Sequence, residues 1–202
     1  MQKSIPMEAF AAIRTELQRR PLEVNRYRSL SGDGRSQAFG IVNRRCLPPD
    51  YSRNCWNRPY LYSLLLEFGD KYVKDISWNA ITVNQNYRAE PHRDKGNRGN
   101  SFLVAFGSYA GGELEIHDGE LIGKHNIWCT PIITDFKECL HSVKDFEGER
   151  YSLVYYNANV RNLDLPPPMV LQHEDGKFYF YRGAECIDPD IGLPHPLKKR
   201  SK

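Results

Sequence analysis

The spacing of apolar residues changes along the chain from a helical period to a strand-like one. In residues 7–19, apolar side chains recur at steps of three and four, which predicts an amphipathic helix. The same spacing predicts a second helix over residues 60–68. After Trp78, short β-like runs are separated by Gly, Asp, Asn or Pro. These runs cover residues 81–87, 102–106, 113–116, 127–130, 132–136, 139–143 and 151–156.

Many short strands at close spacing are typical of a sandwich or a barrel, so the sequence predicts a mostly β fold with flanking helices, of the α+β class. The length of 202 residues suits a single domain. Within it, we expect residues 1–77 to form a helical and basic segment that packs on the core, and residues 78–157 to form the β core. Residues 158–202 are expected to form a C-terminal extension that is partly flexible.

Composition excludes several classes of protein. Hydrophobic residues make up 40% of the chain and charged residues 26%, which excludes a chain that is disordered throughout. The longest apolar runs are too short for a transmembrane helix or a signal peptide, so we expect an intracellular protein, cytoplasmic or nuclear, with no membrane contact. The five Cys are scattered without a CxxC pair, which favours reduced thiols over a structural zinc site. Residues 1–60 hold eleven Lys and Arg against five Asp and Glu, an excess that permits a polyanionic partner.

One short motif carries candidate chemistry. His92 and Asp94 are two positions apart, so on an extended segment their side chains point the same way and can reach one metal ion. His141 lies on a later β-like run that a rolled sheet can bring opposite them. Two His and one carboxylate leave metal positions open for a cosubstrate and O₂, as in non-haem Fe(II) oxygenases. The alternative is a surface His beside a solvated Asp.

Two further polar residues follow His141. Strand alternation places Arg150 and Ser152 on the same face of the last β-like run. A guanidinium gives a carboxylate two parallel hydrogen bonds and a hydroxyl adds a third, so this pair suits the far end of a dicarboxylate. The alternative for Arg150 is a surface ion pair with Glu147 or Glu149.

This order of an HxD motif, a distal His and a basic residue about ten positions further resembles the pattern of the Fe(II)/2-oxoglutarate-dependent dioxygenases. The resemblance spans residues 78–157 and implies a double-stranded β-helix core, the cupin-like jelly-roll, with the metal at one mouth. It implies that the catalytic residues His92, Asp94 and His141 bind Fe(II), and that Arg150 and Ser152 hold the cosubstrate 2-oxoglutarate. The implied reaction uses O₂ to hydroxylate an organic substrate and releases succinate and CO₂.

A narrower resemblance rests on the Asn-Gln-Asn-Tyr run at residues 84–87, on polar residues at 97 and 100–101, and on residues 106–114, which contain Gly-Gly-Glu-Leu. This stretch is similar to the TET and base-J-type branch, which oxidises the methyl group of 5-methylcytosine or thymine in nucleic acid. It implies a methylated nucleobase in DNA or RNA as substrate. The residues expected at the substrate are Asn84, Asn97, Asn100 and Ser101, with Asn86 at the cosubstrate.

Other substrates stay open. Gly-Gly-Glu-Leu and Gly-x-Arg-Tyr-Ser-Leu are also similar to prolyl hydroxylase-type enzymes, so a protein or peptide side chain is the alternative substrate, followed by a small metabolite. The chain departs from AlkB-type repair enzymes, whose second Arg is Tyr156 here, and it lacks the Cys-rich region of mammalian TET domains. A non-enzymatic jelly-roll that binds nucleic acid or sugar is the further alternative, and the complete ligand set argues against it.

Several residues near the motif have two interpretations. Four basic residues either meet phosphates or form a solvated loop. They are Arg88, Arg93, Lys95 and Arg98. The glycine pair at 111–112 is expected to supply positive φ in a turn before a strand. The four consecutive aromatics at 178–181 are expected to cover a sheet face rather than to stack on a base.

Overall fold

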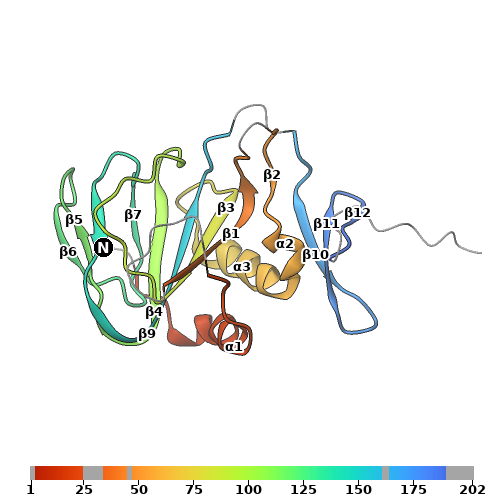
Figure 1. Ribbon diagram of the computed structural model, residues 1–202, viewed down its shortest axis with the longest axis horizontal. Helices are drawn as coiled ribbons and strands as arrows, with labels where there is room; N and C mark the ends of the chain where they lie inside the picture. Colours follow the sequence, from red (N-terminus) through yellow and green to blue (C-terminus); the bar gives the residue numbers. More distant parts are fainter. Residues whose placement is uncertain (1–2, 25–33, 45–46, 161–163, 190–202) are drawn as a thin grey trace, which may run out of the picture.

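The computed structural model describes residues 3–24, 34–44, 47–160 and 164–189, and these are mostly β (Figure 1). A large antiparallel sheet, the major sheet, is built by strands from both halves of the chain. Its order is β2 (Asp50–Tyr51), β1 (Arg35–Val42), β3 (Ala80–Gln85), β9 (Phe146–Tyr156), β4 (Ser101–Gly111) and β7 (Ile132–Thr134). A smaller antiparallel sheet, the minor sheet, has the order β6 (Gly123–His125), β5 (Leu114–Ile116) and β8 (His141–Val143).

Helices cover one face of the major sheet (Figure 1). They are the 3₁₀ helix η1 (Met7–Phe10), α1 (Ala11–Arg19), the short α2 (Asn54–Asn57) and α3 (Pro59–Tyr72). A third antiparallel sheet follows near the C-terminus, with β10 (Pro168–Gln172), β11 (Phe178–Arg182) and β12 (Glu185–Cys186). Phe180 of β11 is buried in the main core beside Tyr51 and Tyr62, so this strand covers the helices α2 and α3 and not the sheet face expected from the sequence.

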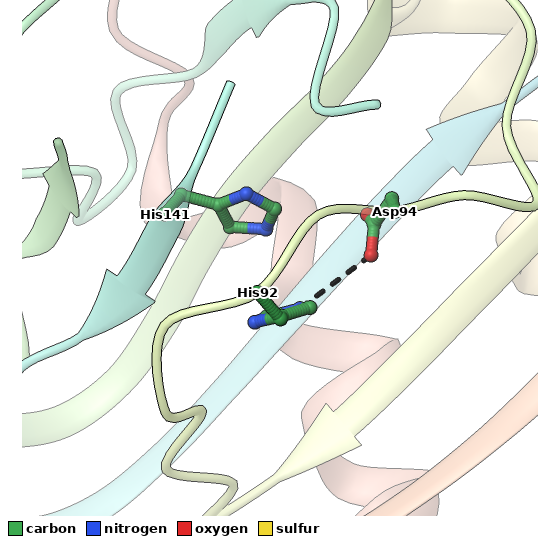
Figure 2. A group of neighbouring side chains, drawn as sticks. All are labelled: His92, Asp94 and His141. Carbon is green, nitrogen blue, oxygen red and sulfur yellow. Dashed lines mark ion pairs between the residues drawn. The ribbon is translucent and has the colours of Figure 1, made fainter. Parts of the chain in front are cut away.

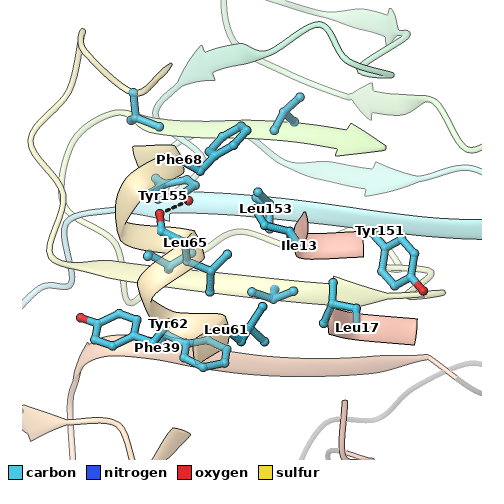
Figure 3. Packing of buried hydrophobic residues seen from close by; sticks show 14 of the residues in the cluster. Ile13, Leu17, Phe39, Leu61, Tyr62, Leu65, Phe68, Tyr151, Leu153 and Tyr155 are labelled. Carbon is cyan, nitrogen blue, oxygen red and sulfur yellow. Dashed lines mark hydrogen bonds between the residues drawn. The ribbon is translucent and has the colours of Figure 1, made fainter. Parts of the chain in front are cut away.

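Strand alternation divides β9 between two environments. Tyr151, Leu153 and Tyr155 point into the core between the major sheet and the helices (Figure 3). The Tyr155 hydroxyl donates a hydrogen bond to the carbonyl oxygen of Leu65 in α3 at 2.7 Å, which satisfies the polar tip of a fully buried ring. Arg150 and Ser152, which alternate with them along the strand, therefore point to the opposite face of the sheet.

The opposite face of the major sheet packs against the minor sheet. Leu103 and Ala105 of β4 share a second apolar cluster with Leu114 and Ile116 of β5. Two facing antiparallel sheets with helices outside are the architecture of a jelly-roll. The predicted fold class, mostly β with flanking helices around such a core, is confirmed.

The structure corrects the sequence-based expectation at several elements. Both predicted helices are present, and the second extends over Pro59–Tyr72. The prediction of a strand at 127–130 is wrong. Cys129 has a φ of 52°, which is outside the β region, and Trp128 forms only a single bridge to β4. Strand β10 was not expected, because it starts at the end of a proline run; proline is tolerated at the first residue of an edge strand. The major sheet also includes β1 and β2, so it extends N-terminal to the residue 78 boundary.

Within the described part of the chain, no helix is long and apolar enough to cross a membrane. Cys55, Cys129, Cys139 and Cys186 are free thiols, as expected, and Cys46 lies outside the described residues. The last part of the C-terminal extension, residues 190–202, also lies outside them, so its expected partial flexibility stays a prediction.

Replacing Phe10 by Ala tests whether the N-terminal helix belongs to the core. Phe10 is fully buried and its ring lies 4.7 Å from that of Phe106 and 5.1 Å from that of Phe68. We expect Phe10→Ala to lower the free energy of unfolding by about 3–5 kcal/mol, because it leaves a cavity between α1 and the sheet. Chemical denaturation measures the loss, and the control Val24→Ala, at an exposed position, changes it by less than about 0.5 kcal/mol. Equal losses in both variants would contradict this packing.

Candidate metal centre

The fold brings His92, Asp94 and His141 together (Figure 2). One ligand atom from each residue lies within 4.8 Å of the other two. His92 Nε2 and Asp94 Oδ1 are 3.5 Å apart, and the centroids of the two imidazole rings are 4.3 Å apart. Two imidazole nitrogens and one carboxylate oxygen form a donor set that suits Fe(II) and leaves coordination positions for other ligands.

Backbone hydrogen bonds position these ligands. His92 and Asp94 lie on the segment between β3 and β4, and His141 is the first residue of β8. The His92 N–H donates to the His141 carbonyl oxygen at 2.9 Å, and the His141 N–H donates back at 3.0 Å. The Asp94 N–H donates to the carbonyl oxygen of Phe136 at 2.9 Å. The segment is thus an irregular loop with one bridge to β8, and this bridge rather than strand alternation aligns the ligands.

A carbonyl oxygen sets the tautomer of each imidazole. His92 Nδ1 lies 2.8 Å from the Glu90 oxygen, and His141 Nδ1 lies 3.0 Å from the Cys139 oxygen. Because a carbonyl only accepts, each Nδ1 carries the proton and each Nε2 presents its lone pair. Burial lowers the pKa of His141, which favours the neutral imidazole that binds a metal.

Asn97 supports the carboxylate of Asp94. Its Nδ2 lies 3.4 Å from Asp94 Oδ2 and donates to Ser101 Oγ at 3.1 Å, and both Asn97 and Ser101 are buried. The loop is also tied to the chain after β9, because the Asn159 N–H donates to the Gly96 oxygen at 2.8 Å. These contacts restrict where the carboxylate can lie.

Arg150 is a buried charge on the cavity face of β9. Its side chain is 2% exposed, and Nε and Nη2 have no hydrogen-bond partner among the described residues. The alternative ion pair with Glu149 is not formed, because Glu149 pairs with Arg14 of α1 at 2.8 Å. Burial lowers the pKa of Arg150, yet a guanidinium stays charged at neutral pH. A buried cation without a counter-ion is unfavourable, so this position fits an anionic ligand.

The three candidate ligands and Arg150 line one cavity between the two sheets. Its volume is about 680 Å³, including the open mouth. Ser152 also lines it and accepts a hydrogen bond from Asn84 Nδ2 at 3.1 Å. The rest of the wall is largely apolar. It includes Ala89, Leu103, Leu114, Phe136, Val143 and Val154.

The residues expected at the substrate are distributed unevenly. Asn84 and Asn97 line the cavity, Ser101 is buried behind Asn97, and Asn100 is exposed outside it. Asn86, expected at the cosubstrate, lies outside the cavity lining. Asn86 follows the end of β3 and has a φ of 50°, so its side chain does not continue on the strand face that carries Asn84. Its Oδ1 accepts a hydrogen bond from the Arg150 backbone N–H at 2.9 Å.

Sequence reasoning missed several residues of the site. Tyr156 lines the cavity. The strand alternation that placed Arg150 and Ser152 on this face could also have predicted Tyr156 there. Tyr109 and Phe146 pack on the Arg150 guanidinium, with their ring centroids 5.4 and 5.6 Å from its Cζ. Their approach depends on the register between β4 and β9, for which the sequence carried no signal.

The basic residues around the loop divide into two groups. Arg93 forms an ion pair with Asp118, and Arg88 forms one with Asp145 at 3.1 Å. Lys95 and Arg98 are exposed. Lys95 lines an open groove that shares His92 and Asp94 with the cavity.

A stability measurement tests whether Arg150 is held for a ligand. We expect Arg150→Met to leave the unfolding free energy unchanged or to raise it by up to about 3 kcal/mol without ligand, because it removes a buried charge that lacks a counter-ion. Arg58 is the matched control. It is equally buried but donates to the Arg20 oxygen and lies 3.9 Å from Glu16, so Arg58→Met should lower stability by about 1–3 kcal/mol. A comparable loss in Arg150→Met would indicate a structural role.

Comparison with known proteins supports the fold. No protein-family model matches the sequence. No curated protein matches it either. Among solved structures, an oxidoreductase of the 2OG-Fe(II) oxygenase family from Burkholderia pseudomallei is similar, with a TM-score of 0.51 and 20% identity. The match covers 74% of this chain and 81% of that one.

Two further structures are similar. NgTET1 in complex with 5mC DNA matches with a TM-score of 0.54 and 16% identity, over 77% of this chain and 69% of that one. A Pseudomonas putida prolyl-4-hydroxylase matches with a TM-score of 0.48 and 15% identity, over 78% of this chain and 91% of that one. The chain thus shares its fold with NgTET1 and with a member of the 2OG-Fe(II) oxygenase family.

Proposed function

We propose that this protein is an Fe(II)- and 2-oxoglutarate-dependent oxygenase. The main support is the buried Arg150 guanidinium, whose Nε and Nη2 lack a hydrogen-bond partner and which has no acidic counter-ion among the described residues, in the cavity that His92, Asp94 and His141 also line. An acid that chelates a metal at one end and carries a second carboxylate at the other matches both parts of this cavity. 2-Oxoglutarate is such an acid.

Each residue has a defined role in this proposal. His92, Asp94 and His141 hold Fe(II), and Arg150 with Ser152 binds the distal carboxylate of 2-oxoglutarate. When bound, Fe(II) supplies the oxidative chemistry in which 2-oxoglutarate, O₂ and a substrate C–H group give succinate, CO₂ and a C–OH group. Bulk water is kept away from the buried Arg150 end of the cavity, which strengthens the interaction between Arg150 and the carboxylate.

For the substrate, we propose a methylated nucleobase, either 5-methylcytosine or thymine in nucleic acid. The groove beside the metal ligands is lined by Tyr87 and Tyr156, whose rings suit a planar base, and by Lys95, whose charge suits a phosphate. The structure of NgTET1, whose fold this chain shares, is a complex with 5mC DNA. Asn84 and Asn97, on the cavity wall, are the candidate contacts to the base. The competing substrate is a protein or peptide side chain.

Metal binding tests the ligand assignment. We expect Asp94→Ala and His141→Ala to abolish binding of Mn(II), a stable substitute for Fe(II), because each removes one of three protein donors. Asn97→Ala should weaken it by about 10- to 100-fold, because the carboxylate loses a supporting contact. Calorimetry measures the affinities. His125→Ala is the control, because the His125 ring is hydrogen-bonded to the Leu121 carbonyl oxygen and is not one of the three candidate metal ligands. Undiminished binding in Asp94→Ala or His141→Ala would remove these residues from the site.

Turnover tests the reaction and the substrate together. We expect succinate release from 2-oxoglutarate in air with Fe(II), and a faster release with duplex DNA that contains 5-methylcytosine or thymine than with a duplex of unmethylated G·C pairs, which lacks both bases. Mass spectrometry should then detect the hydroxymethylated base. Equal, slow succinate release with both duplexes would contradict a methylated nucleobase as the substrate. The proposed oxygenase activity itself would still hold. No succinate from the metal-loaded protein with any tested nucleic acid or peptide would contradict both.

A further inference from the structure

The Arg150 side chain lies against two aromatic rings that contact each other edge to face. Its Cζ is 5.4 Å from the centroid of the Tyr109 ring and 5.6 Å from that of Phe146, distances at which a cation is attracted to a ring face. The two rings also contact each other, with centroids 6.2 Å apart at a steep angle. The rings therefore restrict the sideways movement of the guanidinium.

A glycine completes this enclosure. A Cβ atom on Gly112 would lie 3.0 Å from Arg150 Nε, 3.1 Å from Arg150 Cδ and 3.1 Å from Phe146 Cβ. All three distances are shorter than ordinary van der Waals contacts, so any side chain here would press on Arg150. Gly112 has a φ of 71°, and its N–H donates to the Asp145 oxygen at 2.9 Å, which fixes its backbone. The space that Arg150 occupies is thus bounded by two rings and a backbone surface.

We propose that Gly112 is a positioning residue: together with Tyr109 and Phe146 it fixes the place of the Arg150 guanidinium and so selects the length of the bound dicarboxylate. This inference rests on the proposed function, in which the acid also binds the metal. The metal ligands are fixed by the bridge between His92 and His141, so a fixed guanidinium sets the span between the two ends of the acid. A long Arg side chain without such an enclosure would adapt to acids of several lengths.

Binding of three acids tests the inference. The Mn(II)-loaded protein is titrated without O₂ with oxaloacetate, 2-oxoglutarate and 2-oxoadipate, which have four, five and six carbons. For Gly112→Ala we expect the affinity for 2-oxoglutarate to fall about 10- to 100-fold, as for other displaced binding groups, and the preference for it over the other acids to shrink. Mn(II) affinity itself should not change. Gly176→Ala is the matched control, because Gly176 has a φ of 77° and a Cβ added there would meet nothing within 4 Å, so the variant carries the same backbone strain without touching Arg150.

A second variant covers the case in which Gly112→Ala does not fold. Phe146→Leu keeps the backbone at residue 112 and removes one ring of the enclosure, so it too should reduce the preference for the five-carbon acid. Wild-type affinity and length preference in the folded variants would overturn the inference while leaving the proposed function intact. Failure of the wild-type protein to bind any of the acids would overturn the proposed function, and this inference with it.

Discussion

The two-residue alternation of strand β9 is the constraint on which the site depends. Tyr151 and Leu153 enter the core under the helices, and this places Arg150 and Ser152 in the cavity on the other face. A slip of one residue would drive a guanidinium into the apolar core. Pairing with β3 on one side and with β4 on the other fixes the register of β9 along most of its length.

The candidate metal ligands depend on a different kind of contact. His92 and Asp94 lie outside regular strands, and reciprocal backbone hydrogen bonds to His141 connect their loop to the minor sheet. The loop that carries His92 and Asp94 is therefore positioned by β8, the edge strand of the minor sheet. Arg150 is stable in its buried place because the large core on the opposite face offsets the unfavourable burial of its charge.

The sequence predicted those features that follow from local periodicity. The two long helices, the strand face that carries Arg150 and Ser152, and the meeting of the HxD motif with His141 agree with the structure. Features that depend on tertiary contacts could not be predicted from the sequence. The left-handed backbone of Asn86 follows from its bond to β9, and the enclosure of Arg150 by Tyr109 and Phe146 follows from strand register.

In the proposed function, one cavity binds a metal at one end and a dicarboxylate at the other. Calorimetric titration of the wild-type protein with 2-oxoglutarate, without O₂, with and without Mn(II), tests it most directly. We expect Mn(II) to strengthen binding markedly, because the acid then gains a metal bond in addition to its contact with Arg150. Binding of equal strength with and without Mn(II), or no binding in either case, would contradict the claim.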